Sequence, residues 1–372
     1  MDYKRMPIEV ESPEMIGYSN IPFNLAESSV TDLRFKDLDL NLDDLVIAYT
    51  DHFGKPELRA LLAEEHKNIA ASEVLLTPSA ATALFMIHTT LLNVDSHLIV
   101  VKPNYGTNIE TPKAIGCAVD YVDLKFEDGY CIDVEDVKQK IKPTTRLISI
   151  TSPHNPTGTI VPEETIQALI ALAEERGCYL LIDETYKFLQ LTENTIPDYV
   201  SRSKQVISVC SFSKAFGLPG IRLGWLITKD AALYHQLLAA KEQIIIANSV
   251  VDEEIAFQFY KHKNAFLLAT MEQVNANFKT LQTFMAEHPI LEWVEPNGGV
   301  VCFPRVKANL RFDTEKFYHR LLAEYATFVG AGHWFDESDR SFRLGFGYLS
   351  TQDFKEALVR LNSCLEDAIV NA

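Results

Sequence analysis

Positive charge is scarce in this sequence. Among its 372 residues, 34 are lysine or arginine and 51 are aspartate or glutamate, which gives a formal net charge of -17 at pH 7. Nucleic acids and anionic membrane surfaces bind proteins that present a positive field. We therefore expect neither nucleic acid nor a membrane as a partner. Any anionic small molecule must be held by a few individually placed cations.

The sequence also lacks the cysteine patterns of metal sites and the long apolar runs of membrane segments. Its six cysteines are scattered, with no Cys-x-x-Cys motif and no His/Cys cluster at zinc-binding spacing. No run approaches the roughly 18 apolar residues that a membrane span needs, and residues 1–15 contain no apolar signal-peptide core. These absences predict no metal site, reduced thiols and a cytoplasmic protein.

Residues 55–227 alternate short apolar runs with helical patterns. The expected strands are 73–77, 97–102, 119–124, 146–151, 179–182, 206–212 and 221–227. The expected helices are 55–68, 79–92 and 162–176. This alternation predicts an α/β fold in which a mostly parallel sheet is sandwiched by helices.

The rest of the chain predicts a smaller α+β domain. It contains helical patterns at 230–245, 252–287, 313–325 and 351–369, a hairpin at 291–306, and strands near 327–329 and 342–346. The pattern at 252–287 is long enough for one helix that joins two domains. Residues 1–45 have weak periodicity and many loop formers, which indicates an arm. The expected division is therefore an arm (1–45) that is part of the small domain, a large ligand-binding domain (46–265) and a C-terminal small domain (266–372).

The most unusual segment is 211–225, with the sequence Ser-Phe-Ser-Lys-Ala-Phe-Gly-Leu-Pro-Gly-Ile-Arg-Leu-Gly-Trp. It places Lys214 and Arg222 between two apolar runs, where we expect both cations to be buried. An unpartnered buried charge costs several kcal/mol, on the order of what desolvation costs in general. The ordinary alternatives are a solvated loop lysine and an arginine in a surface salt bridge. The segment as a whole instead predicts an anionic or covalent partner for both side chains.

Other polar residues lie just after the ends of predicted strands. Each of four follows the end of a separate predicted strand: Tyr105, Asn155, Asp183 and Lys214. Ligands of open parallel sheets lie beyond the carboxyl ends of the strands, so one crevice collects this set. Three more residues, Ser79, Ala80 and Ala81, begin a predicted helix after another strand, and free N–H groups at a helix start bind phosphate.

These residue types suit a particular kind of cofactor. The Lys214 amine can form a Schiff base with an aldehyde, and Asp183 can keep a pyridine nitrogen protonated so that the ring withdraws electrons. Tyr186 and Asn155 are placed to hydrogen-bond a ring oxygen, and Tyr105 to stack on the ring. The remaining residues, Ser211, Ser213 and Arg222, form a phosphate clamp in which the planar guanidinium of Arg222 suits two phosphate oxygens.

At this point the chain resembles a known family. The segments 152–158 (Ser-Pro-His-Asn-Pro-Thr-Gly), 183–186 (Asp-Glu-Thr-Tyr) and 211–225 are similar to the signature blocks of the fold-type I, class I/II aminotransferases, which use pyridoxal phosphate. The resemblance extends from about residue 49 to the C-terminus. It implies transfer of an amino group from an L-amino acid to a 2-oxo acid through a Schiff base on Lys214. Its implied catalytic residues are Lys214, Asp183 and Tyr186.

The resemblance also implies a homodimer with shared active sites. In the family, a tyrosine that begins a Tyr-x-x-x-x-Gly-x-x-x-Leu-Arg pattern contacts the phosphate in the neighbouring subunit, and here Tyr49, Gly54, Leu58 and Arg59 match that pattern. Arg343 is similar to the arginine that binds the substrate α-carboxylate, and Asn155 is implied at the substrate as well. Two segments depart from the family: the helix-start loop 77–83 has no glycine, and the arm segment 24–30 matches only loosely.

Several alternatives stay open at the level of sequence. A pyridoxal-phosphate lyase, such as a C–S β-eliminating enzyme, needs the same cofactor residues. A regulator that senses an amino acid without catalysis is another possibility, although an arm of about 45 residues leaves little room for a DNA-binding module. His154 is interpreted as a structural histidine, and Trp334 and Phe335 as core residues or as part of the rim of a substrate pocket.

Overall fold

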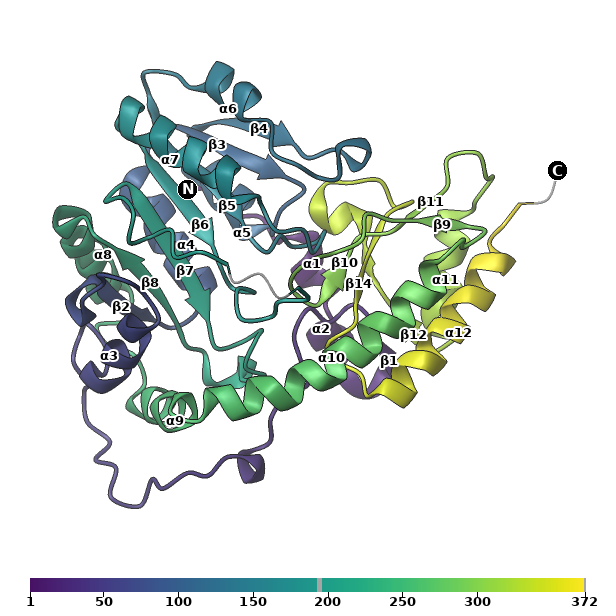
Figure 1. Ribbon diagram of the computed structural model, residues 1–372, viewed down its shortest axis with the longest axis horizontal. Coiled ribbons are helices and arrows are strands. Elements are labelled where there is room, and N and C mark those ends of the chain that lie inside the picture. Colours follow the sequence, from purple (N-terminus) through teal and green to yellow (C-terminus); the bar gives the residue numbers. More distant parts are fainter. Residues whose placement is uncertain (193–195, 371–372) are drawn as a thin grey trace.

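A computed structural model describes residues 1–192 and 196–370 of the chain. Its centre is a seven-stranded sheet with the order β2-β8-β7-β6-β5-β3-β4 (Figure 1). The strands are β2 (Val74–Thr77), β3 (His97–Lys102), β4 (Ala118–Asp123), β5 (Thr145–Thr151), β6 (Tyr179–Asp183), β7 (Val206–Ser211) and β8 (Gly224–Thr228). Neighbouring strands are parallel except that β8 is antiparallel to both β7 and β2. The predicted mostly parallel sheet is confirmed.

Helices cover both faces of this sheet because its strands are apolar on both sides. Successive residues of a strand point to opposite faces, and Leu181 and Ile182 of β6 accordingly belong to two different core clusters. One cluster contains side chains of α4 (Ala80–Leu91), α5 (Thr107–Ile115) and α8 (Ala231–Ile244). The other contains side chains of α3 (Pro56–Glu64), α6 (Val134–Lys140) and α7 (Glu163–Arg176).

The ends of these helices follow local capping chemistry. Ser79 begins α4, where its Oγ accepts a hydrogen bond from the Thr82 N–H at 3.0 Å, and Asp230 caps α8 in the same way. Gly177 adopts the left-handed conformation that ends α7, as the sequence predicts. The helices α5 and α6 were not predicted, because α5 contains an internal proline and α6 is only 7 residues long.

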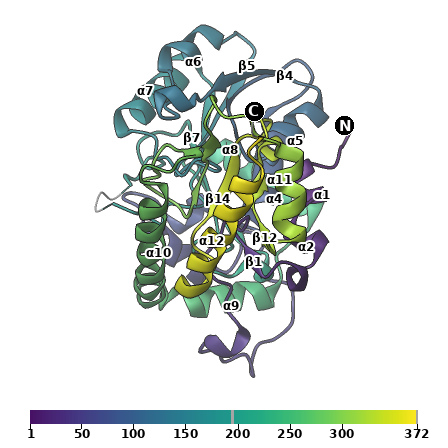
Figure 2. The same cartoon turned by 90° about the vertical axis from the view of Figure 1, so that its right-hand side faces the viewer.

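The C-terminal part of the chain forms a smaller unit beside the sheet. Its elements are α10 (Lys263–Met285), β9 (Leu291–Glu292), β10 (Val301–Cys302), β11 (Arg305–Val306), α11 (Thr314–Ala323), β12 (Thr327–Phe328), β13 (Gly330–Ala331), η6 (Gly332–Phe335), β14 (Phe342–Gly345) and α12 (Thr351–Asp367). The strands β10, β14 and β13 form a three-stranded antiparallel sheet. Helices α10, α11 and α12 pack against one another on its outer side (Figure 2).

Two sequence expectations for this part are wrong. The pattern at 252–287 is not one helix but two, α9 (Val250–Tyr260) and α10, because the chain turns at Lys261 and His262. An aromatic cluster holds this turn, in which the Phe259 ring lies 5.7 Å from that of Phe216 and 5.2 Å from that of Phe266. The predicted hairpin at 291–306 is also only partly formed, since β9 pairs with β11 while β10 between them pairs with β14.

The N-terminal residues form an arm of short elements, as predicted. These are α1 (Pro7–Val10), α2 (Pro13–Ile16), η1 (Tyr18–Asn20), β1 (Phe23–Asn24) and η2 (Phe35–Asp37). Strand β1 pairs in parallel with β12 of the C-terminal unit. This pairing supports placing residues 1–45 with the small domain, although the domain boundaries at 45 and 265 themselves stay a prediction.

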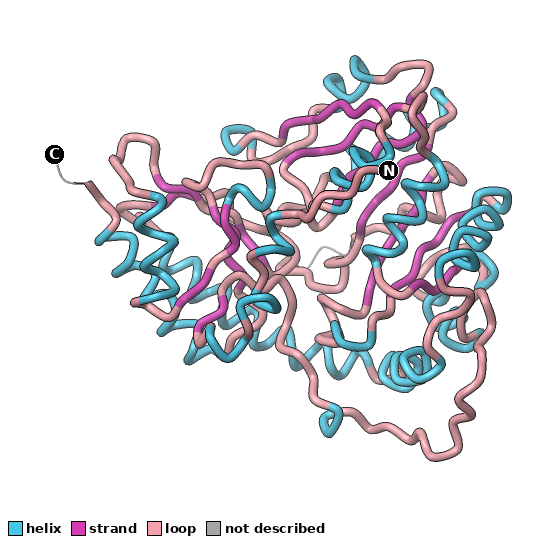
Figure 3. Tube along the Cα trace, turned by 180° about the vertical axis from the view of Figure 1, so that it is seen from behind, coloured by secondary structure: helices cyan, strands magenta, loops and turns pink. Residues whose placement is uncertain are grey.

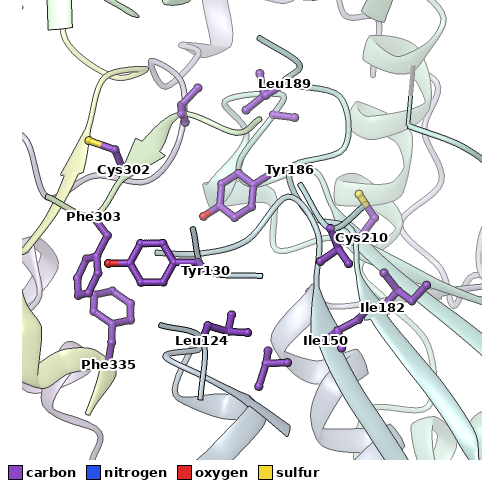
Figure 4. Packing of buried hydrophobic residues seen from close by; sticks show 14 of the residues in the cluster. Leu124, Tyr130, Ile150, Ile182, Tyr186, Leu189, Cys210, Cys302, Phe303 and Phe335 are labelled. Atoms are coloured by element: carbon purple, nitrogen blue, oxygen red, sulfur yellow. The ribbon is translucent and has the colours of Figure 1, made fainter. Parts of the chain in front are cut away.

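A continuous core joins the sheet to the smaller unit. Figure 4 shows Ile150 and Ile182 of the sheet on one side, Cys302, Phe303 and Phe335 of the smaller unit on the other, and the rings of Tyr130 and Tyr186 between them. Because this core is shared, the ends of the strands and the smaller unit are held against each other. In the part of the chain that the structure describes, no helix is both long and apolar enough to cross a membrane.

Candidate active site

A cavity of about 770 Å³ lies where the carboxyl ends of the central strands meet the arm and the smaller unit. Predicted site residues from six separate parts of the chain line this cavity together. They are Ser79, Ala80, Ala81, Tyr105, Asn155, Asp183, Tyr186, Ser211, Ser213, Lys214, Arg222 and Arg343. The structure therefore brings all but one of the predicted site residues to a single place, and the exception is Tyr49.

Lys214 follows β7 and reaches into this cavity with a side chain that is 30% exposed. Its Nζ lies 3.6 Å from Oε1 of Glu27 in the arm. Burial acts to lower the pKa of Lys214, but the carboxylate of Glu27 together with Tyr186 and Tyr105 raises the pKa above the usual value. Glu27 is therefore an anionic neighbour of this lysine within the chain itself.

Asp183 ends β6 and is 6% exposed. Its Oδ1 accepts hydrogen bonds from the N–H of Thr185 at 3.1 Å and from the Thr185 hydroxyl at 2.6 Å. Among the described residues its second oxygen, Oδ2, has no hydrogen-bond donor. Burial raises the pKa of Asp183, against the lowering effect of Thr185. This arrangement leaves one oxygen of a fixed carboxyl free for a protonated ring nitrogen.

The start of α4 is a site for an anion. In the described part of the chain the N–H groups of Ala80 and Ala81 have no acceptor, as is normal in the first turn of a helix. A Cβ atom at Gly224 would lie 2.7 Å from the Ala80 nitrogen, so only glycine allows β8 to approach α4 this closely. Because Gly224 pairs with Ser211 on β7, the helix start and the serine lie together.

Arg222 contributes a cation to the same end of the cavity. The prediction that its side chain is buried is wrong. Its side chain is exposed, and strand β8 begins three residues later than expected, at Gly224. Arg222 has a φ of +40° in the left-handed region, which costs a non-glycine residue roughly 1 kcal/mol. In this conformation its Nη1 donates to the Pro219 carbonyl at 2.7 Å and to Ser213 Oγ at 3.4 Å.

Arg343 and Asn155 form the opposite wall. Arg343 lies on β14 and is 5% exposed; its Nη1 donates to Asn155 Oδ1 at 3.1 Å and its Nη2 to the Ala26 carbonyl at 2.7 Å. The Nε group is buried without a partner in the described residues. Burial lowers the pKa of this guanidinium. A buried cation with an unused donor suits a carboxylate ligand.

Close packing holds the Asn155 loop against the smaller unit. A Cβ atom at Gly158, where φ is +73°, would lie 2.2 Å from the Val301 carbonyl oxygen. Within the loop, the His154 ring contacts Thr157 Oγ1 at 2.8 Å and the Pro103 carbonyl at 2.9 Å. Burial lowers the pKa of His154 to about 4. The interpretation of His154 as a structural residue agrees with these contacts.

Two tyrosines and a tryptophan complete the polar lining. Tyr186 is buried beside Asp183, and Tyr105 is half-buried, with its hydroxyl 3.4 Å from Oε1 of Glu9. Burial raises the pKa of Tyr105. Trp334 also lines the cavity, and its Nε1 donates to Glu11 at 2.7 Å.

Tyr49 lies outside this cavity and is 84% exposed. It belongs to a segment that runs away from the body of the molecule between η2 and α3 (Figures 1 and 3). Val46 and Ile47 in the same segment are also strongly exposed. Within a single chain, the structure gives Tyr49 no contact with the predicted phosphate site.

The sequence did not identify the acidic residues that the arm contributes to the cavity. They are Glu9, Glu14, Glu27 and Asp32, together with Tyr18. One of them, Glu27, could have been noticed in the sequence, because its charge interrupts the mainly apolar run from 21 to 30. The other acids lie in short turns without periodicity, which carry no sequence pattern for a site.

The groups around the cavity fit pyridoxal phosphate. The Lys214 amine matches its aldehyde, the free Asp183 oxygen matches its ring nitrogen, and the α4 start with Arg222 matches its phosphate. The described residues contain no group of three or more His, Cys, Asp and Glu side chains able to hold a metal ion. The fold and the site thus define an enzyme that works with pyridoxal phosphate.

Comparison with known proteins identifies the family. The sequence profile "Aminotransferase class I and II" matches residues 21–361. Capreomycidine synthase of Streptomyces vinaceus is 26% identical over 306 residues, which cover 82% of this chain and 78% of that protein. The arginine–pyruvate transaminase AruH of Pseudomonas aeruginosa is 27% identical over 335 residues, which cover 87% and 84%.

A solved structure has the same fold. The crystal structure of a PLP-dependent aminotransferase from Streptococcus suis matches with a TM-score of 0.91 at 24% identity, and the match covers 100% of both chains. The chain belongs to the class I and II aminotransferases, and it is a transferase that depends on pyridoxal phosphate.

Proposed function

We propose that this protein is a transaminase that moves the amino group of an L-amino acid to a 2-oxo acid. The observation that carries the proposal is that Lys214, Asp183 and Arg343 line one cavity. These three side chains supply an amine, a carboxyl for the ring nitrogen and a carboxylate receptor. Family membership supports the reaction class, and one relative bears the name of a transaminase.

When bound, pyridoxal phosphate supplies an aldehyde that condenses with amines and a ring that withdraws electrons. Lys214 Nζ would hold the cofactor and would act as the general base that takes the proton from the α-carbon of the donor. Asp183 Oδ2 would hold the proton on the ring nitrogen. Tyr186 would donate to the ring oxygen, and so would Asn155 through Nδ2, because its Oδ1 already accepts from Arg343.

The substrate and the phosphate are held by the remaining residues. Arg343 orients the α-carboxylate through a charge-assisted contact, and its position on a strand keeps this orientation fixed. The phosphate is bound by the N–H groups of Ala80 and Ala81 at the start of α4 and by four side chains, Ser79, Ser211, Ser213 and Arg222. Tyr105 stacks on the ring.

Steady-state assays with a panel of amino donors test this function. The visible absorbance of the bound cofactor is followed while each L-amino acid is added, with and without a 2-oxo acid acceptor. Turnover that depends on the acceptor supports the proposal. Release of pyruvate, ammonia or sulfide without an acceptor identifies a lyase instead, and ligand binding without turnover identifies an amino-acid sensor.

The protein acts as a homodimer in which Tyr49 of one chain contacts the phosphate in the other. Support comes from the exposure of Tyr49, Val46 and Ile47, and from the bonds that fix the following loop, such as that from Thr50 Oγ1 to Glu253 at 2.7 Å. The six cysteines are free thiols, which supports a cytoplasmic location.

Mixed dimers test the shared site. Tyr49→Ala and Lys214→Ala chains are each expected to be poorly active alone. Mixing them after mild dissociation creates sites with an intact Lys214 from one chain and an intact Tyr49 from the other. Recovery of activity supports the shared site, whereas the absence of recovery in dimers shown to have exchanged contradicts it.

A further inference from the structure

The arm places a group of carboxylates opposite the cofactor residues. Glu14 lies on α2, Tyr18 on η1, and Glu27 and Asp32 follow β1; all four line the cavity. The Tyr18 hydroxyl lies 3.2 Å from Oε1 of Glu14 and 3.5 Å from Oε2 of Glu27. A second hydroxyl, that of Tyr348, donates to Asp32 Oδ2 at 3.2 Å. The Tyr18 hydroxyl therefore links Glu14 with Glu27, while Asp32 is held separately by Tyr348.

The cations of the cavity do not balance its five carboxylates, which are Glu9, Glu14, Glu27, Asp32 and Asp183. Three cationic side chains line it: Lys214, Arg222 and Arg343. In the proposed function each is used by another group, because Lys214 bonds to the cofactor, Arg222 binds its phosphate and Arg343 binds the α-carboxylate. Within the described residues, Glu14 and Asp32 form no ion pair. Glu27 has only Lys214 as a close cationic partner.

The neighbouring charges shift the pKa values of the arm residues that line the cavity. Burial and the neighbouring Glu27 raise the pKa of Asp32, against the Tyr348 hydrogen bond. Burial and the three carboxylates Glu27, Glu14 and Asp32 raise the pKa of Tyr18. For Glu27, burial is outweighed by Lys214 and Arg343, so its pKa is lowered. A cation that lies among these groups relieves the repulsion between them.

A second observation points to an anionic group of a ligand in the same cavity. Arg343 is nine-tenths buried, lines the same cavity and has an Nε group without a partner in the described chain. Its unused donor and its charge call for a carboxylate. Burial lowers the pKa of Arg343, and Glu27 and Glu14 of the arm act in the opposite direction. One molecule that carries a carboxylate and a distal cation satisfies both ends.

We propose that the amino donor of this enzyme has a side chain that ends in a cation, a guanidinium or an ammonium group, held by Glu14, Glu27 and Asp32. This substrate class rests on the proposed transaminase function, since it is that function which assigns Lys214, Arg222 and Arg343 to other groups. The planar carboxylates and the Tyr18 hydroxyl give the site acceptors for such a group.

Donor pairs that differ in charge but little in shape test the proposal with the holoenzyme. L-Arginine is compared with L-citrulline, and L-lysine with L-norleucine, by kcat/KM for the acceptor-dependent reaction. We expect the cationic member of at least one pair to be preferred by about tenfold or more, because a hydrogen-bonded charge is worth more than 1.4 kcal/mol. The pair with the larger preference identifies the guanidinium or the ammonium group.

Variants then connect the preference to the arm. Asp32→Asn and Glu14→Gln keep the shape of the side chain but remove its charge, so they reduce kcat/KM for the cationic donor severalfold or more and leave the neutral donor nearly unchanged. Glu164→Gln, on the exposed surface of α7, is the matched control and changes neither value. A loss that is equal for both donors in either arm variant indicates a structural role and overturns the assignment of that residue.

A binding measurement without reaction distinguishes the proposed cationic subsite from the proposed transaminase function. The probes are 5-guanidinopentanoate and its neutral counterpart 5-ureidopentanoate, which have no α-amino group and cannot transaminate. Calorimetry with the holoenzyme is expected to show tighter binding of the guanidino compound, and Asp32→Asn is expected to remove the difference. Equal binding of both compounds together with a preference for neutral or acidic donors overturns the cationic substrate class. Charge-dependent binding without turnover of any donor supports the subsite and rejects the transaminase function.

Discussion

The cavity has two sides that differ in origin and in charge. The cofactor side comes from strand ends and one helix start of the central sheet, and its cations are Lys214 and Arg222. The arm side comes from short helices and turns before residue 33, and its charged groups are all carboxylates. The first side is held by a ladder of sheet hydrogen bonds, and the second by side-chain contacts such as that from Tyr18 to Glu14.

The two sides meet different requirements, since one must hold the cofactor and the other must contact the substrate side chain. Residues around the cofactor must hold one fixed structure in any enzyme that uses it, so their geometry is built into rigid elements. Residues of the arm contact the variable part of a substrate, and loops and short elements tolerate such variation. Substitutions on the cofactor side should therefore affect all donors equally, whereas substitutions on the arm side should change the ranking of donors.

The largest effect is expected for Lys214→Ala. It removes both the covalent hold on the cofactor and the general base, so turnover should fall at least about a thousandfold for every donor. The reaction of the bound cofactor with each donor, followed by absorbance, checks this. Lys138→Ala on the exposed side of α6 serves as the control. A loss confined to some donors would contradict a cofactor role for Lys214.

Arg343→Lys should have the next largest effect. Lysine keeps the charge but loses the planar set of donors that binds Asn155, the Ala26 carbonyl and a carboxylate together. We expect kcat/KM to fall about tenfold to a hundredfold for all α-amino acids. The absorbance of the resting cofactor should not change.

Arg176→Lys at the exposed C-terminal end of α7 is the matched control for that substitution. An altered cofactor spectrum in Arg343→Lys would show instead that Arg343 supports the cofactor rather than the substrate. An unchanged kcat/KM would place the carboxylate receptor elsewhere in the cavity.

The comparison also explains how much of the site the sequence could predict. Lys214, Asp183 and Asn155 each follow a strand whose apolar pattern is clear, so the topology of a parallel sheet predicts their meeting. The strands of the sheet follow from the same patterns, whereas their order in the sheet was not predicted. The exposure of Arg222 could not be predicted, because it depends on a left-handed residue and a short η5 helix (Pro219–Ile221) before β8.

The carboxylates that the arm brings to the cavity could not be predicted from sequence for a physical reason. The position of the arm depends on long-range contacts, such as the pairing of β1 with β12 and the bond from Trp334 to Glu11, and neither leaves a periodic pattern. The break between α9 and α10 was missed in a similar way, because aromatic packing against Phe216 overrides a continuous helical pattern.

A smaller effect is expected for Glu27→Gln, which tests the contact between the two sides. Since Glu27 raises the pKa of Lys214, its removal lowers that pKa and increases the neutral fraction of the amine near pH 8. Only the neutral amine condenses with an aldehyde, so the cofactor-free variant should capture pyridoxal phosphate faster at that pH. Its rate profile should shift toward lower pH. Glu14→Gln is the control, and equal profiles for Glu27→Gln and wild type would disprove the coupling.

The smallest effect is expected at the contact that holds the arm to η6. The His333 ring lies 2.9 Å from Glu11 in the arm and 2.8 Å from Asp339. Burial lowers the pKa of His333, but Asp339 and Glu11 outweigh it and raise the pKa above the usual value. The stabilisation is therefore fully present below the unfolded pKa, about 6.5, and is lost as the pH rises through the folded pKa.

Thermal unfolding of wild type and His333→Gln across pH checks this contact. Because the His333 side chain is 41% exposed, solvent screening limits the effect to that of a surface ion pair, and the melting temperature at pH 6 should fall by at most about 2 °C. At pH 9 the two proteins should unfold at the same temperature, since the wild-type ring is then neutral. A difference that persists at pH 9 would mean that packing of the ring, and not its charge, holds the arm over the cavity.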